Sequence, residues 1–322
     1  MEPRLDAGPR RRTSRRSRTQ ADRRVAALTS LTAVARAKVN LFLHVGPLDA
    51  NGYHPLASLV AFADAGDVVT VAPSDRLSLT VTGPFGKPLA GEGDNLILKA
   101  LRALGEATGG GEPALAVTLD KRLPIAAGLG GGSSDAGAAL RLADEALGLN
   151  LGDDSLTALS RAVGADGPMC LAMRSAWAEG VGDRLSFEPA LPPLHAVLAN
   201  PGRPSPTAAV YGAYDAGSTR AADRPAPPPN WSSGEVIDWL ARQRNDLQAP
   251  AVSLEPAVGE ALSAMAATGA RLTRMSGSGA TVFGLFETAD AAREAAGKLR
   301  KLHDNWWIER AVFGDERDEA SQ

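Results

Sequence analysis

Hydrophobic and polar residues begin to alternate at about residue 34, after a start with almost no apolar periodicity. Between residues 38 and 45 one face of this alternation is apolar, and the other carries polar or aromatic side chains. The apolar face contains Val39, Leu41, Leu43 and Val45, and the opposite face contains Lys38, Asn40, Phe42 and His44. A period of two residues is typical of a β-strand with one buried face. The pattern therefore predicts a half-buried strand that begins near Val34.

Later segments show either β-rich runs or apolar residues at helical spacing. Further strands are expected at 67–72, 77–82, 114–119, 280–286 and 307–312, and helices at 95–107, 134–147, 154–163, 236–242, 257–267 and 289–302. Strands and helices interleave without an internal repeat, which favours mixed α/β (α+β) layers in two lobes. We expect an N-terminal lobe at 31–190 and a C-terminal lobe at 191–316. The proline-rich segment 224–230 is expected to be an exposed excursion.

Composition and charge are those of a globular protein with unusual ends. The 322 residues are 44% hydrophobic, which is enough for two modest cores. The net charge is -3, but residues 1–30 hold nine Arg against three acidic residues, a net of +6, which leaves -9 on the remainder. We expect disordered tails at 1–30 and 317–322, although transit peptides and RNA-binding arms share the basic composition of the first. The acidic remainder argues against a nucleic-acid partner.

The chain has one cysteine and no long apolar run. Because Cys170 is alone, an intramolecular disulfide is impossible, and a reducing cytoplasm is the expected compartment. No apolar run approaches the ~20 residues that a transmembrane helix needs. His195, His303 and Cys170 lack metal-ligand spacing, so no zinc site is expected. We therefore expect a soluble monomer or homodimer without a membrane partner.

A glycine-rich segment carries the clearest chemical signal in the chain. Four of the five residues from Gly128 to Gly132 are glycine, and an alanine- and leucine-rich helix is predicted directly afterwards. Glycines let a backbone approach a phosphate closely and adopt positive φ, and the first N–H groups of the helix attract anions. Ser133 and Ser134 can cap that helix or bond a phosphate oxygen. The residues expected to bind ATP are Pro124, Ile125, Ala126, Ala127, Gly128, Leu129, Gly130, Gly131, Gly132, Ser133 and Ser134.

Other nucleotide and nucleophile motifs are absent from the sequence. There is no G-x-x-x-x-G-K-[ST] segment, which excludes a P-loop, and no G-x-G-x-x-G in the glycine loop, which disfavours a Rossmann site. Neither the H-R-D and D-F-G pair of protein kinases nor a G-x-S-x-G elbow surrounds these residues. The interpretation that remains is a nucleotide-binding glycine-serine loop of a different class.

Three ordered motifs give the chain a resemblance to a known superfamily. They are the segments 37–41 (AKVNL), 124–134 (PIAAGLGGGSS) and 276–280 (SGSGA), spread over some 240 residues. Together they resemble the GHMP kinases, small-molecule kinases that use ATP. Within that superfamily, the segments 51–54 (NGYH), 164–166 (GAD) and 178–182 (AEGVG) are similar to members that act on a cytidyl-diphosphate methylerythritol in the non-mevalonate route to isoprenoid precursors. Gly167 and Met169 depart from the usual A-D-V-P pattern at this point but leave Asp166 in place.

The resemblance implies a fold, a reaction and a set of site residues. The fold would have an N-terminal lobe like ribosomal protein S5 and a ferredoxin-like C-terminal lobe, with ATP, its Mg²⁺ and the cytidyl-diphosphate substrate between them. Lys38 and Asp166 would be catalytic, and the Mg²⁺ ligand is not assigned. Asn95 would lie beside the adenine. The residues implied in substrate binding are Asn40, Tyr53, His54, Thr207 and Tyr211, of which Tyr53 and Tyr211 would enclose the cytosine.

Several of these features have simpler interpretations. Asp166 before a proline-started helix is also an ordinary N-cap, and Asn95 is also a helix cap. Lys38 can belong to a solvated strand face, and His54 to a turn. For the whole chain, the alternatives are another GHMP kinase of the homoserine or mevalonate type, a catalytically silent GHMP-like sensor and an RNA-associated protein. Tyr53 and His54 argue against the first alternative, and the presence of both Lys38 and Asp166 argues against the second.

Overall fold

The fold was examined in a computed structural model that describes residues 30–91, 95–187, 191–215 and 220–314. The tails predicted at 1–30 and 317–322 lie outside these residues, apart from Ser30. Strands and helices are mixed along the chain, as predicted. The structure has two groups of strands, one before residue 187 and the other after residue 193. The lobe boundary near residue 190 stays a prediction.

The first group of strands forms a mainly antiparallel sheet. In chain order its strands are β1 (Leu31–Val45), β2 (Leu56–Pro73), β3 (Ser78–Thr82), β4 (Leu115–Asp120), β5 (Ala176–Gly180) and β6 (Arg184–Ser186). The long strand β2 pairs with β1, β4 and β5, whereas β3 runs parallel to β4. Strand β6 pairs antiparallel with β5. Strand β2 is therefore the centre of this lobe.

Helices cover this sheet and are packed closely against one another. They are α1 (Leu96–Ala107), α2 (Gly131–Leu147), α3 (Gly152–Arg161) and α4 (Gly167–Ala172), with a 3₁₀ turn at Lys87–Leu89. Asn95 begins α1, because its side chain accepts the Ile97 N–H at 2.9 Å. Gly137 lets α2 approach α4, since a Cβ there would lie 2.9 Å from the Cys170 carbonyl oxygen. This close packing fixes α4 relative to the glycine loop that starts α2.

The second group of strands has a ferredoxin-like arrangement. In chain order, this lobe contains β7 (Leu194–Asn200), α5 (Thr207–Asp215), α6 (Ser233–Ala241), α7 (Gln248–Leu254), α8 (Pro256–Ala266), β8 (Leu272–Met275), β9 (Val282–Phe286), α9 (Ala289–Leu302) and β10 (Trp307–Phe313). The strand order is β10-β7-β9-β8, and the neighbours are antiparallel. With α8 before β8 and α9 before β10, this is the β-α-β-β-α-β order of the ferredoxin-like fold, as predicted.

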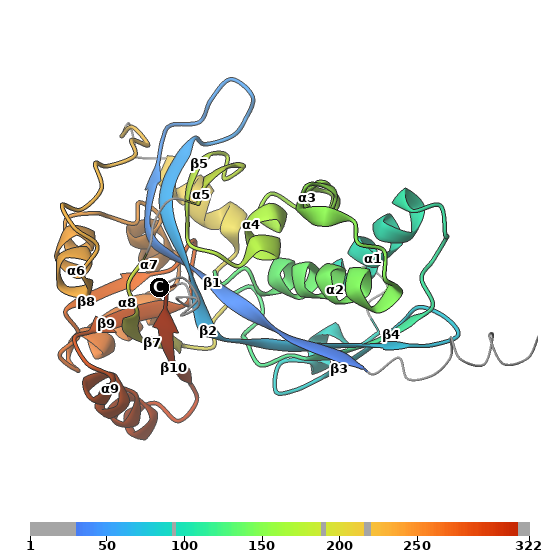
Figure 1. The fold of residues 1–322 in the computed structure, drawn as a ribbon. Coiled ribbons are helices and arrows are strands. Elements are labelled where there is room, and N and C mark those ends of the chain that lie inside the picture. Colours follow the sequence, from blue (N-terminus) through green and yellow to red (C-terminus); the bar gives the residue numbers. More distant parts are fainter. Residues whose placement is uncertain (1–29, 92–94, 188–190, 216–219, 315–322) are drawn as a thin grey trace, which may run out of the picture.

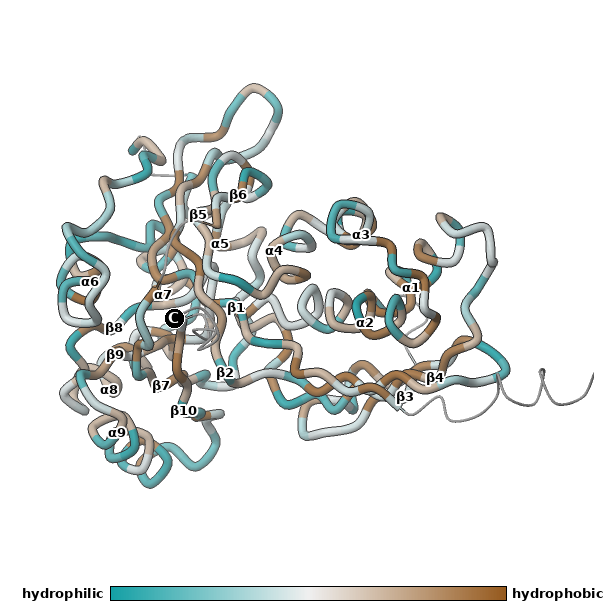
Figure 2. The backbone as a smooth tube through the Cα atoms, in the orientation of Figure 1, coloured by the Kyte–Doolittle hydropathy of each residue, from teal (hydrophilic) through white to brown (hydrophobic). Residues whose placement is uncertain are grey.

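The two lobes are joined through β1 and β2. These two strands run through the middle of the molecule, with α1–α4 to one side and α6, α8 and α9 to the other (Figure 1). Phe313 of β10 pairs with Ala63 of β2 and so continues the sheet from one lobe into the other. In Figure 2 the strand β4, in which every second residue is buried, is largely brown, whereas α9 at the periphery shows teal stretches, as expected for a solvent-facing helix.

Three local predictions differ from the structure. Strand β1 is buried on both faces from Ala37 to Val45, so the prediction of a half-buried strand was wrong. The helix expected from Ser134 begins at Gly131, because the glycine loop itself supplies the first turn. The segment 224–230 is irregular, as predicted, but it is partly packed: Pro228 is buried, and the Ala226 carbonyl accepts the Trp239 indole N–H at 2.8 Å.

A buried arginine connects β8 to β1 and α6. Arg274 is 6% exposed, and its guanidinium donates to the carbonyls of Leu41, Leu240 and Gln243 at 2.8–2.9 Å. Burial lowers the pKa of Arg274 to about 10, which still leaves it charged at neutral pH.

We predict that Arg274→Met lowers the free energy of unfolding by about 3 kcal/mol or more, because three carbonyls lose their donor. Arg271→Met is the matched control at the start of the same strand. Arg271 forms only exposed ion pairs with Asp238 and Glu287, and each such pair is worth about 1 kcal/mol at most. Urea unfolding of both variants measures the difference. Equal losses in the two variants would contradict the role assigned to Arg274.

Candidate active site

A large cleft brings the predicted motifs together. Its volume is about 690 Å³, and it is lined by the start of α1, the glycine loop, β1, the start of α4, α5 and the turn at Gly277 and Ser278. Ten of the eleven predicted loop residues line it, from Pro124 to Ser133. Ser134 is fully buried and does not line the cleft. Lys38, Asn40, Asn95, Asp166, Thr207 and Tyr211 also line the cleft.

The glycine loop has the backbone shape that phosphate binding requires. Gly128 and Gly130 have φ of 75° and 62°, a region that residues with a side chain rarely adopt. A Cβ on Gly128 would lie 2.4 Å from the Ser276 carbonyl oxygen, so only glycine allows this approach. The loop is tied to the two other motifs, since Lys38 N–H donates to the Leu129 carbonyl and the Ser276 hydroxyl donates to the Gly128 carbonyl. The first N–H groups of α2 thus stand at the cleft without a side-chain cap.

Lys38 and Asp166 form an ion pair at the base of the loop. Lys38 Nζ lies 3.0 Å from Asp166 Oδ2, and the side chains are 11% and 39% exposed. Burial alone lowers the pKa of Lys38, but the Asp166 carboxylate and its hydrogen bond outweigh burial, so the pKa lies above its usual value. Asp166 occupies the N-cap position of α4, yet its side chain makes no capping bond. The carboxylate faces the lysine instead, which is not what an ordinary cap does.

Residues implied in substrate binding reach the cleft from β1 and α5. Thr207 Oγ1 lies 2.8 Å from Ser278 Oγ, and Asn40 donates its amide N–H to Ser58 Oγ at 2.8 Å. The rings of His54 and Tyr211 are 5.1 Å apart and tilted by 33°. Tyr53 is 62% exposed, and neither it nor His54 lines the cleft. The roles implied for all of these residues stay predictions.

Comparisons with known proteins agree with this geometry. Residues 95–173 match the family model of the GHMP kinase N-terminal domain, and residues 233–305 match that of the GHMP kinase C-terminal domain. The 4-diphosphocytidyl-2-C-methyl-D-erythritol kinase of Caulobacter vibrioides (strain NA1000 / CB15N) is 51% identical over 284 residues, which cover 87% of this chain and 98% of the relative. The chain belongs to the 4-diphosphocytidyl-2-C-methyl-D-erythritol kinase family of GHMP kinases.

Solved structures are consistent with the assignment of the chain to this family. A crystal structure of a 4-(cytidine 5'-diphospho)-2C-methyl-D-erythritol kinase is 39% identical, has a TM-score of 0.72 and covers 89% of this chain and 100% of its own. The homoserine kinase of Cytophaga hutchinsonii is 18% identical with a TM-score of 0.60, over 88% of this chain and 94% of that one. The second likeness concerns the fold alone. The predicted two-lobed GHMP fold is confirmed. No helix in the described part of the kinase is long and apolar enough to cross a membrane.

A buried charge cluster that was not predicted from the sequence lies behind the glycine loop of this kinase. Lys121 Nζ lies 2.5 Å from Asp67 Oδ2 and 2.7 Å from Asp135 Oδ2, and all three residues are buried. Asp67 also accepts the N–H groups of Arg122 and Leu123, whereas Asp135 Oδ1 has no partner among the described residues. Burial raises the pKa of Asp135 to about 8, against the opposing effect of Lys121. The sequence offers no clear signal for this cluster, since Lys121 stands between Asp120 and Arg122, and Asp135 follows two serines.

The cluster supports the loop from behind. A Cβ on Gly131 would meet Lys121 Nζ at 3.0 Å, so the ammonium lies directly behind the loop backbone. The nearby thiol of Cys170 is chemically quiet, because burial raises its pKa to about 12. Two groups of charged side chains thus lie around the loop, Lys38 with Asp166, and Lys121 with Asp67 and Asp135.

We predict that the stability of the kinase depends on pH through Asp135. Its pKa in the folded state, about 8, lies above the ordinary value of 3.8, so the folded protein holds this proton more tightly than the unfolded chain. This effect destabilises the folded state progressively as pH rises from about 4 to about 8. Asp135→Asn removes the titration and keeps a hydrogen-bond acceptor for Lys121. Urea unfolding at pH 5, 7 and 8.5 should show the variant gaining on the wild type as pH rises.

Lys121→Met provides the control for this interpretation. The substitution leaves two buried carboxylates without a cation, and such a loss typically destabilises a protein by about 3–5 kcal/mol. If Asp135→Asn is as destabilising as Lys121→Met at pH 8.5, the assignment of the high pKa to Asp135 is wrong.

Proposed function

We propose that this kinase transfers the γ-phosphoryl group of ATP to the 2-hydroxyl of 4-diphosphocytidyl-2-C-methyl-D-erythritol, in the non-mevalonate pathway to isoprenoid precursors. The observation that carries the proposal is the Lys38–Asp166 pair, 3.0 Å apart, in the same cleft as an uncapped glycine loop and helix N-terminus. The identity of the proposed substrate comes from family membership. We place the reaction in the cytoplasm.

The chemistry requires an oriented hydroxyl, a place for its proton and positive charge near the phosphoryl oxygens. In our proposal Asp166 orients the acceptor hydroxyl and takes its proton during transfer. Lys38 keeps its charge, since its pKa is raised, and stabilises the negative charge that develops on the attacking oxygen and the transferred group. The loop N–H groups hold the β- and γ-phosphates, because the α2 N-terminus is free of side-chain caps. Asn40, on the same strand as Lys38, positions the substrate.

We assign substrate selectivity to the part of the cleft that α5 lines. Thr207 and Tyr211 line the cleft there, and the Tyr211 ring lies 5.1 Å from the ring of His54, the neighbour of Tyr53. A pair of aromatic rings holds a cytosine by stacking, which contributes about 1–3 kcal/mol per base. Homoserine and mevalonate have no base to place there, which favours the cytidyl substrate over these alternatives.

Magnesium is proposed only as the ion that accompanies ATP. The described residues contain no cluster of three or more metal-binding side chains. Of the two carboxylates that line the cleft, Asp166 pairs with Lys38, whereas Asp135 pairs with Lys121 through Oδ2 and leaves Oδ1 without a partner among the described residues. No step is assigned to the ion. A monomer or homodimer stays our prediction for the assembly.

An ADP-release assay with competing acceptors tests the proposed function. The purified full-length kinase is given ATP and Mg²⁺ with the cytidyl substrate, with mevalonate or with homoserine. We expect turnover with the cytidyl substrate and at least about 10³-fold lower kcat/KM with the other two, because they cannot use the base-binding end of the cleft. Comparable turnover of mevalonate or homoserine would overturn the substrate assignment. No turnover of any acceptor would favour a silent sensor.

Asp166→Asn separates the catalytic role from the capping role. The amide keeps the shape of the carboxylate but cannot accept the hydroxyl proton, so we expect kcat to fall by about 10²–10⁴-fold with little change in the Kd of either ligand. Asn is as good an N-cap as Asp, so a structural aspartate would tolerate this change. Kinetics, calorimetry and thermal melting together decide between the two roles. A folded variant with the wild-type rate would exclude Asp166 from catalysis.

A further inference from the structure

The ring of His54 is held between two oxygen acceptors. Nδ1 lies 2.8 Å from the carbonyl oxygen of Gly46, and Nε2 lies 3.1 Å from Oδ1 of Asp215. The side chain is only 8% exposed, although the neighbouring Tyr53 is among the most exposed large residues of the described chain. Each ring nitrogen thus has an oxygen atom within hydrogen-bonding distance. His54 therefore connects the segment 46–55 with α5.

Asp215 lies on the same face of α5 as two residues of the cleft. It is the last described residue of that helix. Helical spacing of four residues puts Thr207, Tyr211 and Asp215 on one face of α5. Thr207 and Tyr211 line the cleft, and Asp215 contacts His54. The aspartate is thus placed to act on the cleft through His54.

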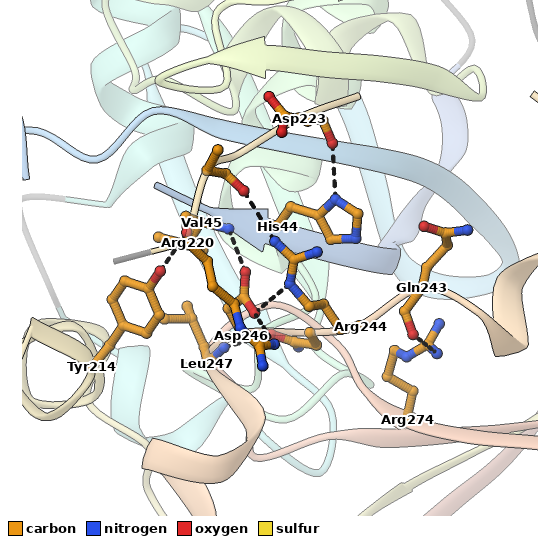
Figure 3. Close-up of polar contacts among 12 residues, drawn as sticks. His44, Val45, Tyr214, Arg220, Asp223, Gln243, Arg244, Asp246, Leu247 and Arg274 are labelled. Carbon is orange, nitrogen blue, oxygen red and sulfur yellow. Dashed lines mark hydrogen bonds and ion pairs between the residues drawn. The ribbon is translucent and has the colours of Figure 1, made fainter. Parts of the chain in front are cut away.

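The ends of the segment 46–55 are fixed by other contacts, so its orientation depends on few side chains. The Tyr214 hydroxyl donates to the Val45 carbonyl, and Asp246 Oδ2 accepts the Val45 N–H at 2.8 Å, as Figure 3 shows. Arg244 in turn holds Asp246 at 2.7 Å. The Gly46 N–H donates to the Pro55 carbonyl at 2.8 Å and closes the segment. Within this closed segment, His54 is the residue that contacts α5 beside the exposed Tyr53.

We propose that Asp215 is a positioning residue for the cytidyl end of the substrate. It holds the His54 ring against Tyr211, at a ring distance of 5.1 Å, and thereby fixes the direction in which Tyr53 is presented for stacking. Asp215 does not contact the reacting atoms and acts through His54. This inference rests on the proposed function, because it assigns a specificity residue to the same cleft.

The test compares Asp215→Ala with the matched control Asp238→Asn. Asp238 also forms a surface ion pair from a helix, with Arg271 at 2.6 Å, but it does not line the cleft. We expect Asp215→Ala to raise KM for the cytidyl substrate about 3- to 10-fold, the range of a part-exposed charged hydrogen bond, with KM for ATP and kcat within about twofold. Asp238→Asn should leave all three constants unchanged.

A double-mutant comparison shows whether Asp215 acts through His54. In a His54→Ala background, Asp215→Ala should raise KM for the cytidyl substrate no further, whereas independent effects would multiply. Asp215→Glu should recover part of the wild-type KM. Thermal melting identifies a purely structural residue, because loss of the contact with His54 would then lower Tm and leave KM for the cytidyl substrate unchanged. If Asp215→Ala does not fold, Asp215→Ser is measured in the same way.

The outcomes separate this inference from the function on which it rests. Wild-type turnover of the cytidyl substrate together with an unchanged KM in Asp215→Ala overturns the positioning role alone. A KM that rises equally for ATP and the cytidyl substrate also overturns it. No wild-type turnover of the cytidyl substrate overturns both proposals.

Discussion

The edge of β1 that does not pair with β2 is the constraint on which the active site depends. One edge of β1 pairs with β2, and along the other edge its backbone groups bind elements from distant parts of the chain. Lys38 N–H reaches the glycine loop, Asn40 N–H reaches Ser276, and the Leu43 N–H and carbonyl bind the backbone of Arg244 and Asp246. An exposed strand edge normally invites aggregation. Here the loop that holds the phosphates and the turn that supports it satisfy the edge, so assembling the site and protecting the sheet are the same event.

Buried charge is arranged differently at the two positions that carry it. Lys38 and Asp166 are a single pair with the carboxylate 39% exposed, as our proposal for Asp166 requires. Lys121 and its two carboxylates are at most 4% exposed, although Lys121 and Asp135 border the cleft, and this burial suits support of the loop. The penalty for burying two ions is large, and it is offset only when every group is paired. Asp135 Oδ1 is unpaired among the described residues, and burial, together with the neighbouring Asp67, raises the pKa of Asp135 despite Lys121.

The parts of the site that local composition encodes could be predicted, and the parts that long-range packing creates could not. The glycine loop is visible in the sequence because positive φ and close backbone approach require glycine at consecutive positions, such as Gly128 and Gly130. The interlocked contacts of Lys121 were not predictable, because Asp67 lies 54 residues away and nothing in its own segment marks it. The double burial of β1 was missed for a similar reason. Its second face is covered by residues of both lobes, and alternation along one strand carries no information about them.

The division of labour between the lobes explains how one fold can serve different acceptors. The phosphate loop, Lys38 and Asp166 come from the first lobe and are held by short backbone contacts that tolerate little change, since a single Cβ on Gly128 would collide with a carbonyl at 2.4 Å. The part of the site proposed to bind the base is formed by side chains of α5 and of the closed segment 46–55, which meet through the His54 contacts with Tyr211 and Asp215. Side chains at such a contact can be exchanged without disturbing the loop, because their backbone is anchored elsewhere, at Val45 by Asp246 and Tyr214. The physical separation of a rigid backbone cradle from a replaceable side-chain contact therefore lets acceptor specificity change while phosphoryl transfer is preserved.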